Sequence, residues 1–271
     1  MTGIISQAVS YCRTSPLVVK FYRMIDTELR LTWNKLIHFN WIFGLILLLT
    51  VCVPRFWMVL HANQTGNYGN IGIIMAISAL IPFIFLSKDG RKQIGITKPK
   101  NYSWIVYSFL SGIAISTLIF VLGYLLYTNS LDNWYVYIGK SYNIGTDLTI
   151  QDRLIYFIIF AVTGMCFSPI GEELFFRGIV HASFSSSLGE RKATIIDSLA
   201  FALTHLAHFG IVYIYGSWGF LFIPSILWVL AMFITSLVFI QCKKMTGSII
   251  GAIASHAGFN VSMIYFIFYQ L

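Results

Sequence analysis

The sequence predicts an all-α protein, a polytopic membrane bundle of about seven to eight transmembrane helices. Of its 271 residues, 57% are hydrophobic and only 10% are charged, and the mean hydropathy of +0.76 exceeds what the core of a water-soluble domain requires. The hydrophobic residues gather in stretches near the length of a bilayer crossing, with the basic residues in short segments between them. Composition and spacing therefore predict the same class.

Seven hydrophobic spans are predicted, with boundaries near residues 39–60, 70–87, 104–127, 153–170, 193–209, 220–241 and 247–270. An eighth, short span within Ile211 to Trp218 is the alternative count. Residues 1–38 carry scattered Arg and Lys and lack the compact apolar core of a cleavable signal peptide, so we expect a cytosolic segment that can lie partly as an amphipathic helix on the membrane. Residues 39–271 are then the transmembrane domain, without an internal repeat or a long linker.

The formal net charge of +8 is explained by membrane topology. When the seven spans are threaded in order, the basic segments at 88–100, 191–192 and 243–244 all fall on the side of the N-terminus, whereas loops 61–69 and 210–219 contain no Lys or Arg. This alternation predicts a multi-pass protein of the cell membrane, with a cytosolic N-terminus and an external C-terminus. The expected partner of its surface is the lipid bilayer, and no nucleic acid is expected.

Three ionisable side chains interrupt an apolar stretch at Glu172, Glu173 and Arg177, and such groups mark functional sites at membrane depth. Side chains of adjacent residues diverge by about 100° around a helix, whereas residues four apart share a face. Glu173 is therefore expected to pair with Arg177 as structural support of the site. Glu172 points elsewhere and needs a polar neighbour from another helix.

Two further polar insertions follow, with His205 in the fifth span and His256 in the seventh, where Asn260 lies one turn later on the same face. Gly247, Gly251 and Ser255 form a row of small residues on that seventh span, which lets a neighbouring helix approach closely. A lone membrane histidine is more often a satisfied interhelical hydrogen bonder. The occurrence of both histidines together with the carboxylate of Glu172 and the carboxamide of Asn260 favours a hydrolytic site.

These residues can form either of two kinds of catalytic site. In one, Glu172 and His205 take the proton of an attacking water, while His256 and Asn260 donate hydrogen bonds to the oxyanion that develops on a carbonyl. In the other, Glu172, His205 and His256 hold a zinc ion with water in the fourth position. No H-E-x-x-H motif is present, and the four cysteines stand far apart without a C-x-x-C pair.

The three motifs Glu172-Glu173-x-x-x-Arg177, Phe201-x-x-x-His205 and His256-x-x-x-Asn260 occur in this order on successive spans. Together they resemble the CAAX-protease and bacteriocin-processing (CPBP, or Abi) family of intramembrane endopeptidases, and the similarity covers about residues 70–270. The resemblance implies cleavage of membrane-associated peptides or proteins, with Glu172 and His205 activating water, His256 and Asn260 forming the oxyanion hole, and Glu173 and Arg177 structural. Members are described both as metalloproteases and as glutamate-type enzymes, so a catalytic zinc stays open.

Bacterial members of that family are linked to peptide maturation, bacteriocin self-immunity and the handling of surface proteins, and the composition suits a low-GC bacterium. A non-catalytic membrane binding or immunity protein of the same fold is one alternative. A proton-coupled transporter is another, since transporters also bury Glu, Arg and His.

The depths of the predicted site residues do not match. Glu172 falls at the inner end of the fourth span, whereas His205 and His256 lie about 14 to 18 Å from the inner ends of their spans at 1.5 Å per residue. Either a helix re-enters after a break at residues 168–171, or the fourth span is shifted outward. The catalytic interpretation requires Glu172 within about 10 Å of one of the histidines, or a conformational route that brings them together.

Overall fold

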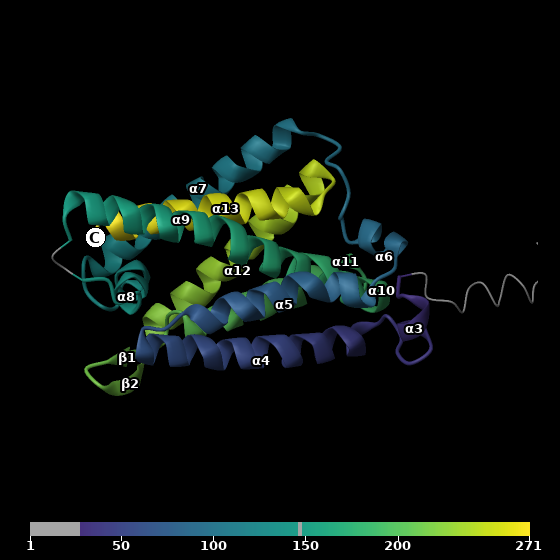
Figure 1. Cartoon of the computed structure of the whole chain (residues 1–271), viewed down its shortest axis with the longest axis horizontal. Coiled ribbons are helices and arrows are strands. Elements are labelled where there is room, and N and C mark those ends of the chain that lie inside the picture. The colour runs from purple at the N-terminus through teal and green to yellow at the C-terminus, as the bar shows by residue number, and fades with distance from the viewer. Residues whose placement is uncertain (1–27, 146–147) are drawn as a thin grey trace, which may run out of the picture.

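The computed structural model describes residues 28–145 and 148–271 and shows a bundle of long helices (Figure 1). Residues 1–27 of the predicted cytosolic segment lie outside the described residues. The helices, in order, are α3 (Leu31–Asn34), α4 (Trp41–Thr65), α5 (Gly69–Phe85), α6 (Lys88–Gln93), α7 (Ser103–Tyr127), α8 (Trp134–Ser141), α9 (Ile150–Glu173), the π-helical segment η1 (Leu174–Val180), α10 (His181–Leu188), α11 (Glu190–Thr204), the short 3₁₀ segment η2 (His205–Ala207), α12 (Phe222–Thr246) and α13 (Ile249–Tyr269).

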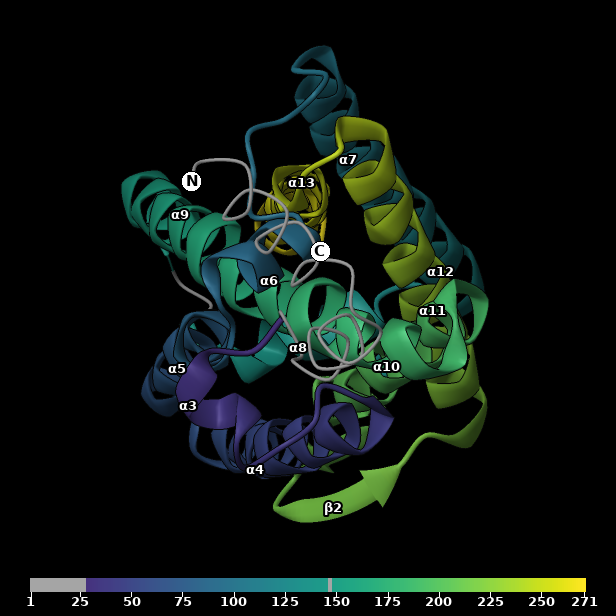
Figure 2. The ribbon, with the colours of Figure 1, turned by 90° about the vertical axis from the view of Figure 1, so that its right-hand side faces the viewer.

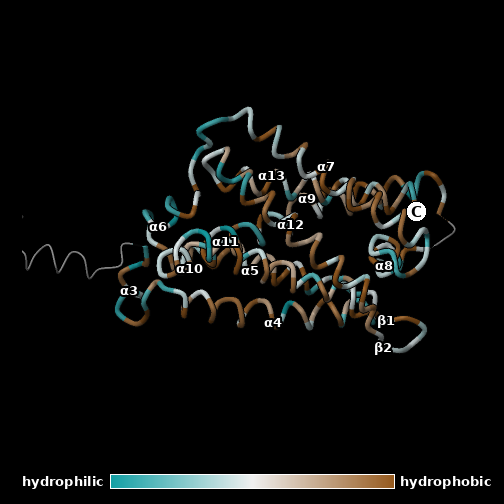
Figure 3. The backbone as a smooth tube through the Cα atoms, turned by 180° about the vertical axis from the view of Figure 1, so that it is seen from behind, coloured by the Kyte–Doolittle hydropathy of each residue, from teal (hydrophilic) through white to brown (hydrophobic). Residues whose placement is uncertain are grey.

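Helices occupy all seven predicted spans, and five of those in the described part of the chain are long and apolar enough to cross a membrane, judged by length and composition. These five are α4, α7, the continuous helix through α9 and α10, α12 and α13. α5 is a shorter apolar helix of 17 residues, about 26 Å long at 1.5 Å per residue. The long helices are predominantly hydrophobic along their length, whereas α6 is hydrophilic (Figure 3).

The fourth predicted span ended too early. The helix that begins at Ile150 does not break at Pro169 but continues through η1 to Leu188, over 39 residues. Within it, all seven residues of η1 are buried, in the wider π-helical turns that often accompany functional sites. Glu172 therefore lies well inside a long helix and not at the inner end of a short one, which removes the predicted mismatch of depth.

The fifth predicted span is also different from the prediction. α11 has only 15 residues, about 22 Å, and it opens with Glu190, Arg191 and Lys192, so it is too short and too polar to cross the hydrocarbon core by itself. The chain then forms an antiparallel hairpin, β1 (Ile211–Ile214) and β2 (Ser217–Phe220), where the alternative count placed an eighth span. Tyr215 and Gly216 close this hairpin with positive φ angles of 50° and 81°, which suits a two-residue turn.

The loops separate to two ends of the bundle as the threading predicted. At one end, the amide of Lys100 donates to the carbonyl of Thr246, and the Lys244 ammonium pairs with Glu190 at 3.0 Å. At the other end, Tyr68 donates to Ser141, and other hydrogen bonds join α4 to η2 and β1 to α8. The basic segments thus gather at the end that carries α6 and α10 (Figure 1).

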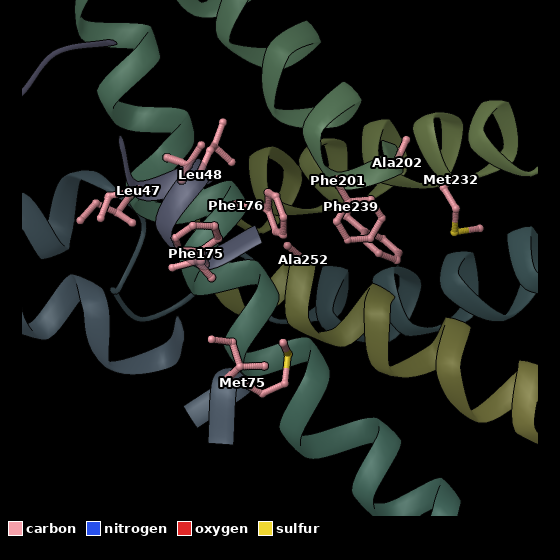
Figure 4. Close-up of a cluster of buried hydrophobic side chains, with 14 of the residues drawn as sticks. Leu47, Leu48, Met75, Phe175, Phe176, Phe201, Ala202, Met232, Phe239 and Ala252 are labelled. Atoms are coloured by element: carbon pink, nitrogen blue, oxygen red, sulfur yellow. The ribbon is translucent and has the colours of Figure 1, made fainter. Parts of the chain in front are cut away.

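α9 contacts α5 on one side and α13 on the other, and its continuation η1 is buried inside the bundle. Viewed along the bundle, α4 and α5 lie on one side of it and α7, α12 and α13 on the other (Figure 2). Phe176 of η1 packs edge-on against Phe201 of α11, and Phe201 packs in the same way against Phe239 of α12 (Figure 4). All three rings belong to the hydrophobic core, and those of Phe201 and Phe239 also line a cavity.

Small residues let α7 and α13 approach closely. A Cβ atom on Gly112 would lie 1.8 Å from the carbonyl oxygen of Ser255, and one on Gly258 would lie 2.1 Å from that of Phe109. The predicted row of small residues is correct for Gly251 and Ser255, which are buried on α13. Gly247 is not part of that helix, because it adopts the left-handed conformation that ends α12.

The first prediction concerns this close contact. Gly112→Ala should destabilise the protein by about 1 to 3 kcal/mol, because the added methyl group meets backbone atoms that cannot rotate away. Gly72→Ala is the matched control, since a Cβ there has no neighbouring heavy atom within 4 Å. Thermal unfolding of the purified variants in detergent, followed by tryptophan fluorescence, gives the comparison. Equal melting temperatures for the two variants would contradict it.

The second prediction concerns orientation. The basic end should face the cytosol, because Lys and Arg in short loops are retained there. Alkaline phosphatase fused after Tyr269 should be active outside the cell, and the same enzyme fused after Lys100 should be inactive. Fusions to a cytosolic fluorescent protein should give the reciprocal pattern. The reverse result for both reporters would show that the chain is inserted the other way round.

Candidate active site

One cavity of about 420 Å³ brings the predicted catalytic residues together. Glu172, His205, His256 and Asn260 all contribute to its wall, although they come from α9, η2 and α13. Most of the remaining wall is apolar, and it includes residues of α4, α5, α8 and α12. Such a cavity, apolar with a few convergent polar groups, has the general character of a ligand site.

Glu172 is 2% exposed and has two hydrogen-bond donors on one carboxylate oxygen. Arg55 of α4 donates from Nη2 to Oε1 at 2.8 Å, and Ser168, one turn earlier on α9, donates to the same oxygen. The other oxygen, Oε2, is buried without a hydrogen-bond partner among the described residues. Oε1 of Glu172 thus accepts two hydrogen bonds, and Oε2 is available to accept one.

His205 faces that available oxygen. Its Nδ1 lies 2.7 Å from the backbone carbonyl of Phe201, which can only accept, so Nδ1 carries a proton. Nε2 lies 4.0 Å from Oε2 of Glu172. In the neutral ring Nε2 has a free lone pair, so two hydrogen-bond acceptors face each other across this gap. The indole of Trp228 fixes the backbone here by donating to the carbonyl of His205 at 3.0 Å.

The carboxylate of Glu173 contacts two side chains, the guanidinium of Arg177 and the imidazole of His256. Its Oε2 lies 3.2 Å from Nε of Arg177, so the predicted pair is confirmed, and both side chains are fully buried. Its Oε1 accepts from Nδ1 of His256 at 2.7 Å, a contact that helix geometry did not predict. The guanidinium of Arg177 also lies 4.0 Å from the ring centroid of Phe201, within the range of a cation–π interaction. Glu173 therefore joins η1 to α13.

His256 and Asn260 share the face of α13 that lines the cavity, as predicted. The ring of Phe239 stacks on His256 with centroids 4.8 Å apart. Asn260 donates from Nδ2 to the carbonyl of Gly164 at 2.8 Å, which holds the side chain against α9 and leaves its second N–H unused. Both side chains are therefore held by neighbours on other helices.

Sequence reasoning missed Arg55 and Ser168. Arg55 has a recognisable signal, because it is a lone cation inside the first predicted span, and ionisable residues at membrane depth mark functional sites. Ser168 has a weaker one, since it lies four residues before Glu172 and so on the same helix face. Neither belongs to the three motifs.

The proposed zinc triad is not assembled in this geometry. The described residues contain no group of three His, Cys, Asp or Glu side chains arranged to hold a metal ion. The guanidinium of Arg55 occupies Oε1 of Glu172, where a dication would bring further positive charge, whereas the Nδ1 contacts of His205 and His256 leave both Nε2 atoms free. As arranged among the described residues, Glu172, His205 and His256 do not form a three-ligand zinc site.

Comparison with known proteins gives one match. The family model of Rce1-like type II CAAX prenyl endopeptidases matches residues 153–262, a segment that contains all three motifs but not Arg55. No curated protein matches the chain, and no solved structure does so either. The match confirms the resemblance that the motifs predicted: over residues 153–262 the chain is similar to Rce1-like type II CAAX prenyl endopeptidases, which is consistent with the CAAX-protease and bacteriocin-processing family.

Proposed function

We propose that this chain is a glutamate-type intramembrane endopeptidase that hydrolyses peptide bonds in membrane-associated peptides or proteins. The observation that carries the proposal is the 4.0 Å separation between Oε2 of Glu172 and Nε2 of His205. A water molecule that donates one hydrogen bond to each acceptor, at ordinary lengths and near its own bond angle, needs acceptors about 4.3 Å apart. The two side chains therefore suit the binding of one water through both of its protons.

A water held in this way is an activated nucleophile. Its lone pairs are left free to attack a peptide carbonyl carbon as Glu172 or His205 removes one proton. The carbonyl oxygen then becomes an oxyanion. When the carbon–nitrogen bond breaks, the proton held by the base passes to the leaving nitrogen and the second proton of the water follows it, so the products are a carboxylate and an ammonium group. No group outside the chain is needed to balance this step.

The oxyanion donors are assigned to His256 and Asn260. Because Nδ1 of His256 is held by Glu173, Nε2 is the ring nitrogen left to donate to the oxyanion, as it does in the imidazolium form. Asn260 supplies its unused N–H. Both groups are fixed by other helices before substrate binds, and preorganised donors of this kind stabilise developing charge strongly in a water-poor site.

The proposal extends to the placement of the chain in the membrane. We propose a multi-pass protein of the bacterial cell membrane with its basic end in the cytosol, in which α5 and α11 accompany the five longer helices and complete about seven crossings or partial crossings. The cavity then lies within the bundle, where peptide segments embedded in the bilayer can reach it. An exposed apolar side chain, Phe167 of α9, lies at its wall and is suited to contact such a segment.

The third prediction tests the base. Glu172→Gln should reduce cleavage by at least about 100-fold, because the amide cannot accept a proton from water, while its oxygen still accepts from Arg55 and supports the fold. Glu190→Gln is the matched control, since that carboxylate lies at the basic end and is half exposed. Cleavage of fluorogenic peptides, including a transmembrane segment and a farnesylated CAAX peptide, should be measured in proteoliposomes.

The outcomes separate the functions. Cleavage that is lost in Glu172→Gln and kept in Glu190→Gln supports the peptidase. A folded, stable wild type without Glu172-dependent cleavage of any of these peptides would instead favour a non-catalytic membrane binding or immunity protein. Activity that survives exhaustive chelation would support the glutamate-type mechanism, and loss of activity together with stoichiometric bound zinc would overturn it.

The fourth prediction tests the ion pair between Glu173 and Arg177. Arg177→Met or Glu173→Gln alone should destabilise the protein by about 3 kcal/mol or more, because each leaves a buried charge without its partner. The double variant should be more stable than either single variant, since no unpaired charge remains. Melting temperatures in detergent give the comparison. Additive losses in the double variant would show that the two side chains do not support each other.

A further inference from the structure

Arg55 is the one Lys, Arg, Asp or Glu residue in α4. The other residues of this 25-residue helix are mostly apolar and suited to contact with lipid or to packing in the core. Its side chain is 5% exposed, so it does not reach water at either end of the helix. A guanidinium held in this position is costly unless it has a specific partner. That partner is Glu172, on a helix more than a hundred residues later in the chain.

The contact is selective between the two oxygens of Glu172. Arg55 and Ser168 both donate to Oε1, whereas Oε2 has no hydrogen-bond partner among the described residues and faces His205. Two donors on one oxygen restrict rotation of the carboxylate about its terminal bond. If they were absent, either oxygen could turn toward either neighbour, and the 4.0 Å spacing between Oε2 and Nε2 of His205 would not be maintained.

We propose that Arg55 is a positioning residue of the active site, which anchors Oε1 of Glu172 so that Oε2 is held as the base opposite His205. The inference rests on the proposed peptidase function and extends it to α4, which lies outside the segment similar to the family.

A role in positioning differs from a role in folding alone. If Arg55 only neutralised a buried charge, its variants would lose activity in proportion to the loss of folded protein. If it orients Glu172, the folded fraction loses turnover, while substrate binding is kept because the rest of the cavity wall is unchanged. The split between kcat and KM therefore distinguishes the two roles.

The fifth prediction uses three variants of the full chain in proteoliposomes, assayed with the fluorogenic peptide that wild type cleaves in a Glu172-dependent manner. Arg55→Gln should lower kcat by about 100-fold with KM within about threefold of wild type. The kcat of Arg55→Lys should lie between those of Arg55→Gln and wild type, about 10-fold below wild type. The ammonium keeps the positive charge but lacks the reach of the planar guanidinium. Arg153→Gln, which removes an exposed arginine from the start of α9, should match wild type.

Chemical rescue adds a readout that a purely structural role does not move. With Arg55→Ala, millimolar ethylguanidinium should restore part of kcat in a saturable way, and sodium chloride at equal ionic strength should not. Folding of each variant is followed by its melting temperature. If Arg55→Gln does not fold, Arg55→Lys decides, because its retained charge supports the fold.

The results that overturn the inference are specific. Arg55→Gln that folds and keeps kcat within about threefold of wild type would remove the positioning role, as would Arg55→Lys with the kcat of wild type. In both cases a still inactive Glu172→Gln would show that the peptidase proposal stands. A wild type without Glu172-dependent cleavage would overturn the proposed function, and this inference with it.

Discussion

The cost of burying charge inside an apolar bundle governs this structure. Glu172, Glu173, Arg55 and Arg177 are each at most 4% exposed, and each has an oppositely charged partner within 3.2 Å. Ions at membrane depth are tolerated only when paired. These contacts therefore favour particular helix neighbours, since Arg55 joins α4 to α9 and Glu173 joins the end of α9 to α13 through His256. The contacts Arg55–Glu172 and Glu173–His256 thus bring together α4, α9 and α13, three of the helices that line the cavity.

The adjacent glutamates have different surroundings although they share one helix. Glu173 accepts a hydrogen bond at Oε1 from His256 and forms an ion pair at Oε2 with Arg177, and it does not line the cavity. Glu172 has one oxygen engaged and one directed to His205 across a gap suited to water. A carboxylate paired with a cation outside the cavity is suited to support, and one with a free oxygen that lines the cavity is suited to chemistry.

The continuous helix from Ile150 to Leu188 explains how polar groups from distant spans meet at one level. The sequence around Pro169 and Gly171 suggested a break, because proline lacks an N–H and glycine is a weak helix former. The helix instead passes through buried π-helical turns, and α5 packs directly against Gly171. A Cβ atom at that position would lie 2.6 Å from the carbonyl oxygen of Met75 in α5. Close packing of α5 thus accounts for the glycine without a break in the helix.

The helical membrane class, the loop alternation, the Glu173–Arg177 pair and the shared face of His256 and Asn260 could all be predicted from the sequence, because they depend on composition and on spacing along one helix. The contacts of Arg55 with Glu172 and of Glu173 with His256 could not, because they join residues 117 and 83 positions apart and exist only in the folded bundle. The same holds for the length of α9–α10, the short α11 and the hairpin after it. Helix periodicity specifies which side chains share a face, but only the packing of whole helices specifies which faces meet.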